Sequence, residues 1–334
     1  MKLEDRAPDE AEGTVLAHAV PLARGRLAKG TLLDATSIAR LVDGGVRSVE
    51  VAVPEAGDVG EDEAATRCAA AMLDPHLLAD TATTGRVNLR AGADGLFLAD
   101  RAVVDALNAI DPRLTLATLP DTTRVTARTL VATVKVIPFF VPDAAVTAWE
   151  AAAANALRVA PWRARSVAHV STVLPGMKST VLDKTRHALA ARLDGTGAAL
   201  RNEVRVGHER AAFADALRAE AAEGPDVIVV FGASAVTDAA DVVPSAIVAA
   251  GGRIERVGMP VDPGNLLVWG RLGSAIVLGA PGCARSPARN GFDWALDRAL
   301  AGIDEPEAIA RLGVGGLLKE TPRGFAREAD GEAG

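Results

Sequence analysis

Hydrophobic positions in the second half of the chain alternate between short β-branched runs and longer segments with helical spacing. The runs predict strands at residues 166–172, 203–206, 226–231, 253–257, 266–269 and 275–278. The longer segments predict helices at residues 179–193, 209–222, 239–250 and 290–301. Strands that alternate with helices over short connections are typical of a mostly parallel sheet covered on both faces. We therefore expect a three-layer α/β/α domain over residues 161–303.

The first 160 residues carry shorter and less regularly spaced elements. The pattern predicts a short helix capped by Thr36 or Ser37, a strand at 46–53, and a helix at 61–73 with an acidic first turn. A strand ending at Pro138 and a helix at 143–156 follow. We expect a smaller α+β region over residues 1–160, formed as one or two small lobes. Residues 304–334 lose the periodicity and form a tail.

Composition narrows the class of protein. Hydrophobic residues make up 49% and charged residues 24%, which is ordinary for a folded protein. An aromatic content of 3%, no tyrosine and a net charge of −7 argue against a nucleic-acid partner. Cys68 and Cys283 are the only cysteines, so neither a disulfide framework nor a four-cysteine zinc site is expected. No apolar signal core or membrane-length apolar window appears, which predicts a cytoplasmic protein with no membrane partner.

The most informative loop follows the strand at 226–231. The strand ends at Gly232, and the small residues after it would expose backbone N–H groups to a bulky anion. Ser234 and Thr237 add hydroxyl donors. Asp238 and Asp241 are candidate catalytic residues that could hold Mg²⁺ against a phosphate, because magnesium takes one or two protein carboxylates plus substrate oxygens. A helix cap followed by a solvated acidic residue explains the two aspartates equally well.

Three further loops follow predicted strands, so their residues should meet at the carboxyl edge of the sheet, where such folds bind ligands. Pro281 and Gly282 form a turn, after which Arg285 could neutralise a phosphate; a surface turn with a solvated arginine is the alternative. Lys178 and Lys184 are placed to meet an anion. The remaining candidate binding residues are Thr172, Asp183, Pro263 and Gly264. The five histidines (His18, His76, His169, His187 and His208) show no ligand spacing and are predicted to be structural or surface residues.

The order of these loops resembles that of the molybdopterin-binding domain shared by MogA- and MoeA-type proteins. The counterparts of the family's glycine-rich and proline-containing loops are 232–241, 262–265 and 280–283, and Asp183-Lys184-Thr185 follows the first strand. Ala233 replaces the second glycine of the family's Gly-Gly pair, and Asp262 and Asn265 replace two lysines. The tyrosine-containing segment of the family is absent, since the chain has no tyrosine. Overall the chain resembles a divergent MoeA-like subgroup that is sometimes fused to a cytidylyltransferase-like domain.

The resemblance implies a protein of molybdenum cofactor biosynthesis that binds molybdopterin or adenylyl-molybdopterin. It further implies Mg²⁺ at Asp238 and Asp241, a molybdenumtransferase-like insertion of molybdate, and a homo-oligomer. Two alternatives stay open. One is a non-catalytic carrier or regulatory module that serves a partner such as a separate nucleotidyltransferase. The other is a CinA-like nucleotide pyrophosphatase, which shares this domain fold.

Overall fold

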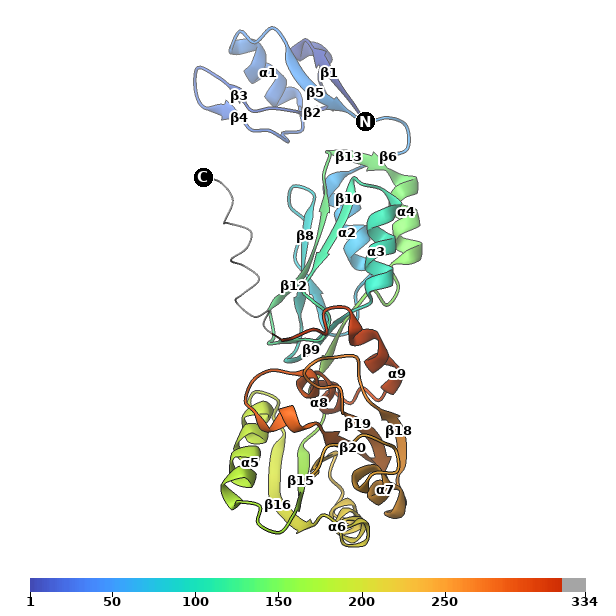
Figure 1. Cartoon of the computed structure of the whole chain (residues 1–334). Coiled ribbons are helices and arrows are strands. Elements are labelled where there is room, and N and C mark those ends of the chain that lie inside the picture. Colours follow the sequence, from blue (N-terminus) through green and yellow to red (C-terminus); the bar gives the residue numbers. More distant parts are fainter. Residues whose placement is uncertain (320–334) are drawn as a thin grey trace, which may run out of the picture. The chain divides into compact units, whose positions relative to one another are not determined.

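The computed structural model of the chain describes residues 1–319, shown in Figure 1. The chain separates into two compact units, Met1–Ala160 and the part that begins at Pro161. Within the described residues, no helix is long and apolar enough to span a bilayer.

The first part of the N-terminal unit is a small three-stranded antiparallel sheet with one helix. The sheet has the order β1-β5-β2, from β1 (Lys2–Arg6), β5 (Val49–Val53) and β2 (Val15–Leu16). Helix α1 (Ala35–Asp43) begins at Asp34, whose carboxylate accepts a hydrogen bond from the Ser37 backbone N–H at 2.7 Å. The predicted cap at Thr36 or Ser37 is therefore wrong: both lie inside the helix. Strands β3 (Val20–Pro21), β4 (Arg26–Leu27) and the short helix η1 (Pro8–Glu10) complete this part.

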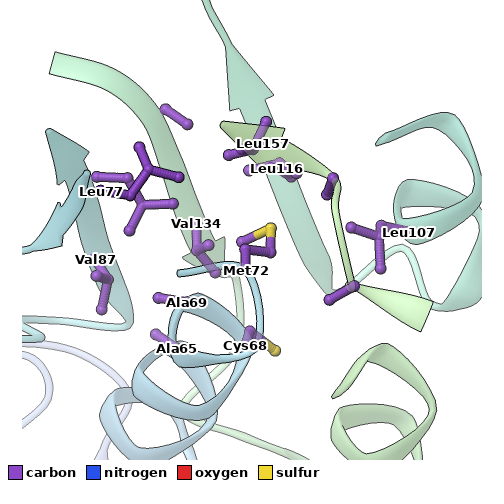
Figure 2. Close-up of a cluster of buried hydrophobic side chains, with 14 of the residues drawn as sticks. Ala65, Cys68, Ala69, Met72, Leu77, Val87, Leu107, Leu116, Val134 and Leu157 are labelled. Carbon is purple, nitrogen blue, oxygen red and sulfur yellow. The ribbon is translucent and has the colours of Figure 1, made fainter. Parts of the chain in front are cut away.

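The rest of the N-terminal unit surrounds the larger of its two hydrophobic cores, part of which is shown in Figure 2. Helix α2 buries Ala65, Cys68 and Ala69 against Leu77, Val87 and Val134 of a four-stranded antiparallel sheet. Burial raises the pKa of the Cys68 thiol to about 12, so this cysteine is a packing residue. The strands of this part are β6 (Asp58–Gly60), β7 (Leu77–Ala79), β8 (Arg86–Ala91), β9 (Gly95–Ala99), β10 (Leu114–Thr118), β11 (Thr123–Val125), β12 (Leu130–Val136), β13 (Phe140–Pro142) and β14 (Leu157–Pro161). The helices are α2 (Glu61–Ala70), α3 (Arg101–Ile110) and α4 (Asp143–Ala152).

A six-stranded sheet forms the middle layer of the second unit, with the order β16-β15-β17-β20-β19-β18. All pairings are parallel except those of β19, which runs antiparallel to both neighbours. The strands are β15 (Ser166–Val173), β16 (Ala199–Gly207), β17 (Val227–Phe231), β18 (Arg253–Val257), β19 (Val268–Leu272) and β20 (Ala275–Ala280). The connection after β15 leads to β16 on one side, and the next leads to β17 on the other. In sheets of this kind such a switch point opens a ligand crevice at the strand ends.

Helices cover both faces of this sheet, which confirms the predicted three-layer α/β/α architecture. On one face Phe213 of α6 and Ile247 of α7 pack with Val170, Ile228 and other strand residues. On the other face, Phe231 of the sheet contacts Phe292 of α8, over whose ring lies Arg192 of α5. The helices are α5 (Ser179–Leu193), α6 (Arg210–Ala222), α7 (Val242–Ala249) and α8 (Gly291–Leu300), with a short 3-10 helix η2 (Gly282–Arg285) between β20 and α8.

Residues 304–319, predicted to belong to a tail, contain the short helices α9 (Pro306–Ile309) and η3 (Ala310–Gly313). This segment returns to the loop after β18. The Asp262 backbone N–H donates to the Gly316 carbonyl at 2.8 Å, and the Leu318 N–H donates to the Asp262 carbonyl at 2.8 Å. The Lys319 ammonium pairs with the Asp262 carboxylate at 2.5 Å. Residues 320–334 of the predicted tail lie outside the described residues.

Candidate functional site

Three neighbouring strand ends contribute side chains to one hydrogen-bonded row. Thr172 lies near the end of β15, His208 directly follows β16, and Ser234 lies in the loop after β17. The Thr172 hydroxyl lies 2.7 Å from His208 Nδ1, and His208 Nε2 lies 2.8 Å from Ser234 Oγ. The structure thus brings the predicted residues Thr172 and Ser234 to the same place, with a histidine between them.

Sequence reasoning missed His208. It was grouped with the structural histidines because the five show no metal-ligand spacing, yet its neighbours here are hydroxyl groups. The usable signal was its position directly after a strand that ends at Gly207, at the edge where the ligand loops also begin. Knowing that β16 and β17 both flank β15 would have completed the inference.

Backbone donors accompany the hydroxyl of Ser234. Ala233 N–H donates to Thr172 Oγ1 at 2.8 Å, and Val236 is buried in the core beneath α7. Among residues 1–319, the N–H groups of residues 234–236 make no hydrogen bond. Ser234 and Ala235 are exposed, and consecutive N–H groups without a partner in the protein can bind an anion.

The two predicted metal-binding carboxylates shape their own loop. Asp241 Oδ2 accepts hydrogen bonds from the Thr237 and Asp238 N–H groups and from the Thr237 hydroxyl, the last at 3.1 Å. The two N–H donors hold the pKa of Asp241 below its usual range, and the nearby His208 adds a smaller contribution. Asp238 Oδ1 accepts from the Ala240 N–H at 2.7 Å. This folding of 237–241 explains why α7 begins at Val242 and not at the predicted residue 239; Asp238 is not its cap.

Packing inside the protein explains why glycine stands at the ends of β17 and β20. A Cβ atom at Gly232 would lie 2.9 Å from a methyl carbon of Val243, and one at Gly279 would lie 3.2 Å from the other. Gly232 therefore lets helix α7 approach the sheet closely, whereas a Cβ at Gly279 would first meet the Cβ of Val268 on the neighbouring strand β19, at 2.7 Å. The interpretation that Gly232 is small in order to admit an anion stays a prediction.

Arg285 makes its contacts inside the protein. Its guanidinium donates to Thr185 Oγ1 at 3.0 Å and to the Gly232 carbonyl at 2.9 Å, and it lies over the Phe231 ring. Burial lowers the pKa of Arg285. The side chain thus ties the start of the β17 loop to α5 and η2, and its predicted contact with a phosphate stays a prediction. Of its predicted neighbours, Pro281 is buried and Gly282 is exposed.

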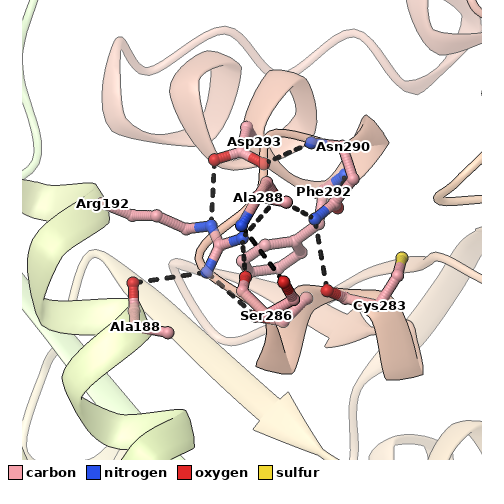
Figure 3. A network of polar contacts seen from close by, with 9 residues as sticks. Ala188, Arg192, Cys283, Ser286, Ala288, Asn290, Phe292 and Asp293 are labelled. Carbon is pink, nitrogen blue, oxygen red and sulfur yellow. Dashed lines mark hydrogen bonds and ion pairs between the residues drawn. The ribbon is translucent and has the colours of Figure 1, made fainter. Parts of the chain in front are cut away.

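A second arginine holds the loop between η2 and α8, as Figure 3 shows. Arg192 on α5 is 6% exposed and donates to the carbonyls of Ala284 and Ser286 at 2.9 and 2.8 Å, and to Asp293 Oδ1 at 2.9 Å. Asn290 caps α8 by accepting from the Phe292 N–H, and its amide donates to the Cys283 carbonyl at 3.3 Å. This network positions the η2 loop without a ligand.

The other predicted binding residues are spread around the same unit. Pro263 and Gly264 lie in the loop after β18 and pack against the start of α8, where the Gly291 N–H donates to the Pro263 carbonyl at 2.8 Å. Lys178, just before α5, and Lys184, within it, are exposed. Asp183 is exposed and pairs with Arg205 at 2.6 Å. The described residues contain no group of three or more His, Cys, Asp or Glu side chains placed to hold a metal ion.

Comparisons with known proteins bear on this unit. A family model described as "Probable molybdopterin binding domain" matches residues 167–301. Among solved structures, the chain is similar to a molybdopterin biosynthesis MoeA protein from Pyrococcus horikosii, with 14% identity and a TM-score of 0.30, over 91% of this chain and 76% of that one. A comparison with curated proteins gave no match.

Proposed function

Because residues 167–301 match the model of a probable molybdopterin binding domain, we propose that this chain takes part in molybdenum cofactor biosynthesis and binds molybdopterin or its adenylylated form at the carboxyl ends of β15 and β17. The observation that carries the proposal is the set of N–H groups at residues 234–236, which have no partner within the described chain and lie beside the Ser234 hydroxyl. These groups supply donors for the phosphate of the pterin.

The whole chain carries a net charge of −7, so the positive charge that attracts a phosphate must come from a few side chains near the site. Lys178 is exposed at the start of α5, which follows β15, and Lys184 is exposed in the second turn of that helix; in this proposal both attract the phosphate. Arg285 contributes indirectly, because it holds the Gly232 carbonyl and so the start of the donor loop.

A metal-dependent reaction is the finer part of the proposal. Among the described residues, Asp238 Oδ2 and Asp241 Oδ1 accept no hydrogen bond, so each carboxylate has one oxygen that could bind Mg²⁺, which usually takes one or two protein carboxylates. Bound there, magnesium would polarise the phosphoanhydride of an adenylylated pterin during molybdate insertion.

The test of binding uses the full chain and a pterin that carries a phosphate monoester. We expect Ser234→Ala to weaken binding about 10-fold or more, the usual result of losing a hydrogen bond to a charged group. Ser274→Ala is the matched control. Ser274 lies in the turn before β20, at the amino ends of the parallel strands, whereas the proposed site lies at their carboxyl ends. Equal affinities of the wild type and Ser234→Ala would contradict the proposed place of the phosphate.

A carrier without catalytic activity is the second candidate. Asp262, which stands where the family has a lysine, pairs with Lys319, so this loop offers the ligand less positive charge. Incubation of the chain with adenylylated pterin, molybdate and Mg²⁺ separates the two candidates. Release of AMP supports insertion, and tight binding without AMP release supports the carrier.

A further inference from the structure

The row of contacts at the strand ends has a definite hydrogen-bond direction. Ala233 N–H donates to Thr172 Oγ1, which lies 2.7 Å from His208 Nδ1. Thr172 is 0% exposed, and no other acceptor for its hydroxyl proton is found among residues 1–319. Leaving a buried hydroxyl proton without an acceptor costs free energy, so the Thr172 proton must point to Nδ1.

This direction determines the tautomer of the histidine. A neutral imidazole that accepts at Nδ1 carries its proton on Nε2. The Nε2–H of His208 therefore donates to Ser234 Oγ, 2.8 Å away. Since the Ser234 oxygen accepts from the histidine, its own proton is available to another acceptor. Ser234 is exposed, so that acceptor can come from a ligand.

We propose that His208 is a positioning residue that turns the Ser234 hydroxyl into a hydrogen-bond donor for a phosphate oxygen of the ligand. The inference rests on the proposed pterin phosphate binding and adds the group that orients the phosphate donor. It also assigns Thr172 a specific task, which is to select the histidine tautomer. With this direction Ser234 is a ligand-binding group, because His208 offers it a proton and does not remove one.

The first test measures the tautomer in the free protein. Nuclear magnetic resonance of the full chain with ¹⁵N-labelled histidine, at mildly alkaline pH, distinguishes Nε2–H from Nδ1–H imidazoles, and His208→Gln assigns the signal. We expect the Nε2–H form in the wild type and a loss of that preference in Thr172→Val. An Nδ1–H form in the wild type would overturn the proposal, since Ser234 would then donate to His208.

The second test measures affinity for two probes, a pterin phosphate monoester and the same pterin without the phosphate. Two substitutions of His208, by asparagine and by glutamine, test the need for the Nε2–H donor. The glutamine amide can replace this donor, whereas the shorter asparagine amide cannot reach its position. We expect His208→Asn and His208→Ala to weaken binding of the phosphorylated probe about three- to tenfold, the loss of one neutral hydrogen bond. His208→Gln should stay within about twofold of the wild type, and the unphosphorylated probe should show no change.

A double variant completes this experiment. If His208 acts through Ser234, then adding His208→Ala to Ser234→Ala should cost little further affinity, a departure from additivity typical of coupled residues. His187→Ala is the control, because His187 is exposed on α5. A wild type that binds neither probe would overturn the proposed function and this inference together. Equal affinities of the wild type and His208→Asn for the phosphorylated probe would overturn only the role of His208.

Discussion

Asp241 uses one oxygen of its carboxylate to hold the loop that carries Ser234, and its other oxygen accepts no hydrogen bond from the described residues. Its Oδ2 accepts from Thr237 and Asp238, whereas Asp238 makes a single local contact with the Ala240 N–H. The two aspartates look equivalent in the sequence, but the Asp241 side chain makes more of the hydrogen bonds that hold this loop. A substitution at each position separates loop structure from metal binding.

We expect Asp241→Asn to lower affinity for the pterin phosphate about five- to tenfold both with and without Mg²⁺, because the amide accepts loop hydrogen bonds less strongly. Asp238→Asn should lower only the Mg²⁺-dependent component. Titration calorimetry of both variants, with and without a chelator, measures the difference. A loss in Asp241→Asn that appears only with Mg²⁺ would show that its loop contacts are dispensable for binding.

His169 predicts a pH dependence of folding. It is completely buried on β15, its Nδ1 has no partner, and burial lowers its pKa from 6.5 to about 4 even though Glu203 lies nearby. The unfolded chain therefore binds a proton first, so stability is full above pH 6.5 and falls as the pH approaches 4. Between neutral pH and about pH 5 the loss from this residue is about 2 kcal/mol.

Urea unfolding near neutral pH and near pH 5 measures this effect. We expect His169→Gln, which cannot take up the proton, to lose about 2 kcal/mol less than the wild type over that interval. His187→Gln provides the comparison at an exposed position of the same unit. The same acid sensitivity in His169→Gln and the wild type would exclude His169 as its source.

At the scale of elements, α5 and the η2 loop depend on one guanidinium. Arg192 donates to several carbonyls of that loop and to Asp293 at the first turn of α8 (Figure 3). A lysine has one nitrogen and cannot span these acceptors. We expect Arg192→Lys to lower the free energy of unfolding by about 2–4 kcal/mol, since it leaves buried acceptors unpaired. Urea unfolding measures the loss. Arg186→Lys, on the same helix, should change stability much less.

At the scale of the whole molecule, ligand binding and folding are linked. A ligand that binds only the folded second unit stabilises it by about 2.7 kcal/mol at a concentration 100 times its dissociation constant. We therefore expect the pterin phosphate to slow hydrogen exchange, most of all at the carboxyl ends of β15 and β17. Exchange followed by mass spectrometry locates the effect. Slowed exchange confined to residues 1–160 would place the ligand in the other unit.

Predictions from the sequence were most accurate where structure follows from a local repeat. Helix Ser179–Leu193 and strand Arg253–Val257 have the predicted bounds, because their spacing of apolar residues is set within the segment itself. Loop geometry was predicted less well. The start of α7 and the cap of α1 were misplaced because a side chain, Asp241 or Asp34, decided where the helix could begin.

The amino-acid sequence by itself determined the layered α/β/α architecture of the second unit and the small-residue loops at its strand ends. Both follow from local features, which are the spacing of apolar residues and the runs of small residues between them. Only the tertiary structure decided that β15 lies between β16 and β17, and hence that Thr172, His208 and Ser234 meet. It also decided that Gly232 leaves room for α7, and that Gly279 leaves room for Val268 of β19 as well as for α7. Strand order depends on contacts between segments far apart in the chain, and no local repeat encodes which strands become neighbours.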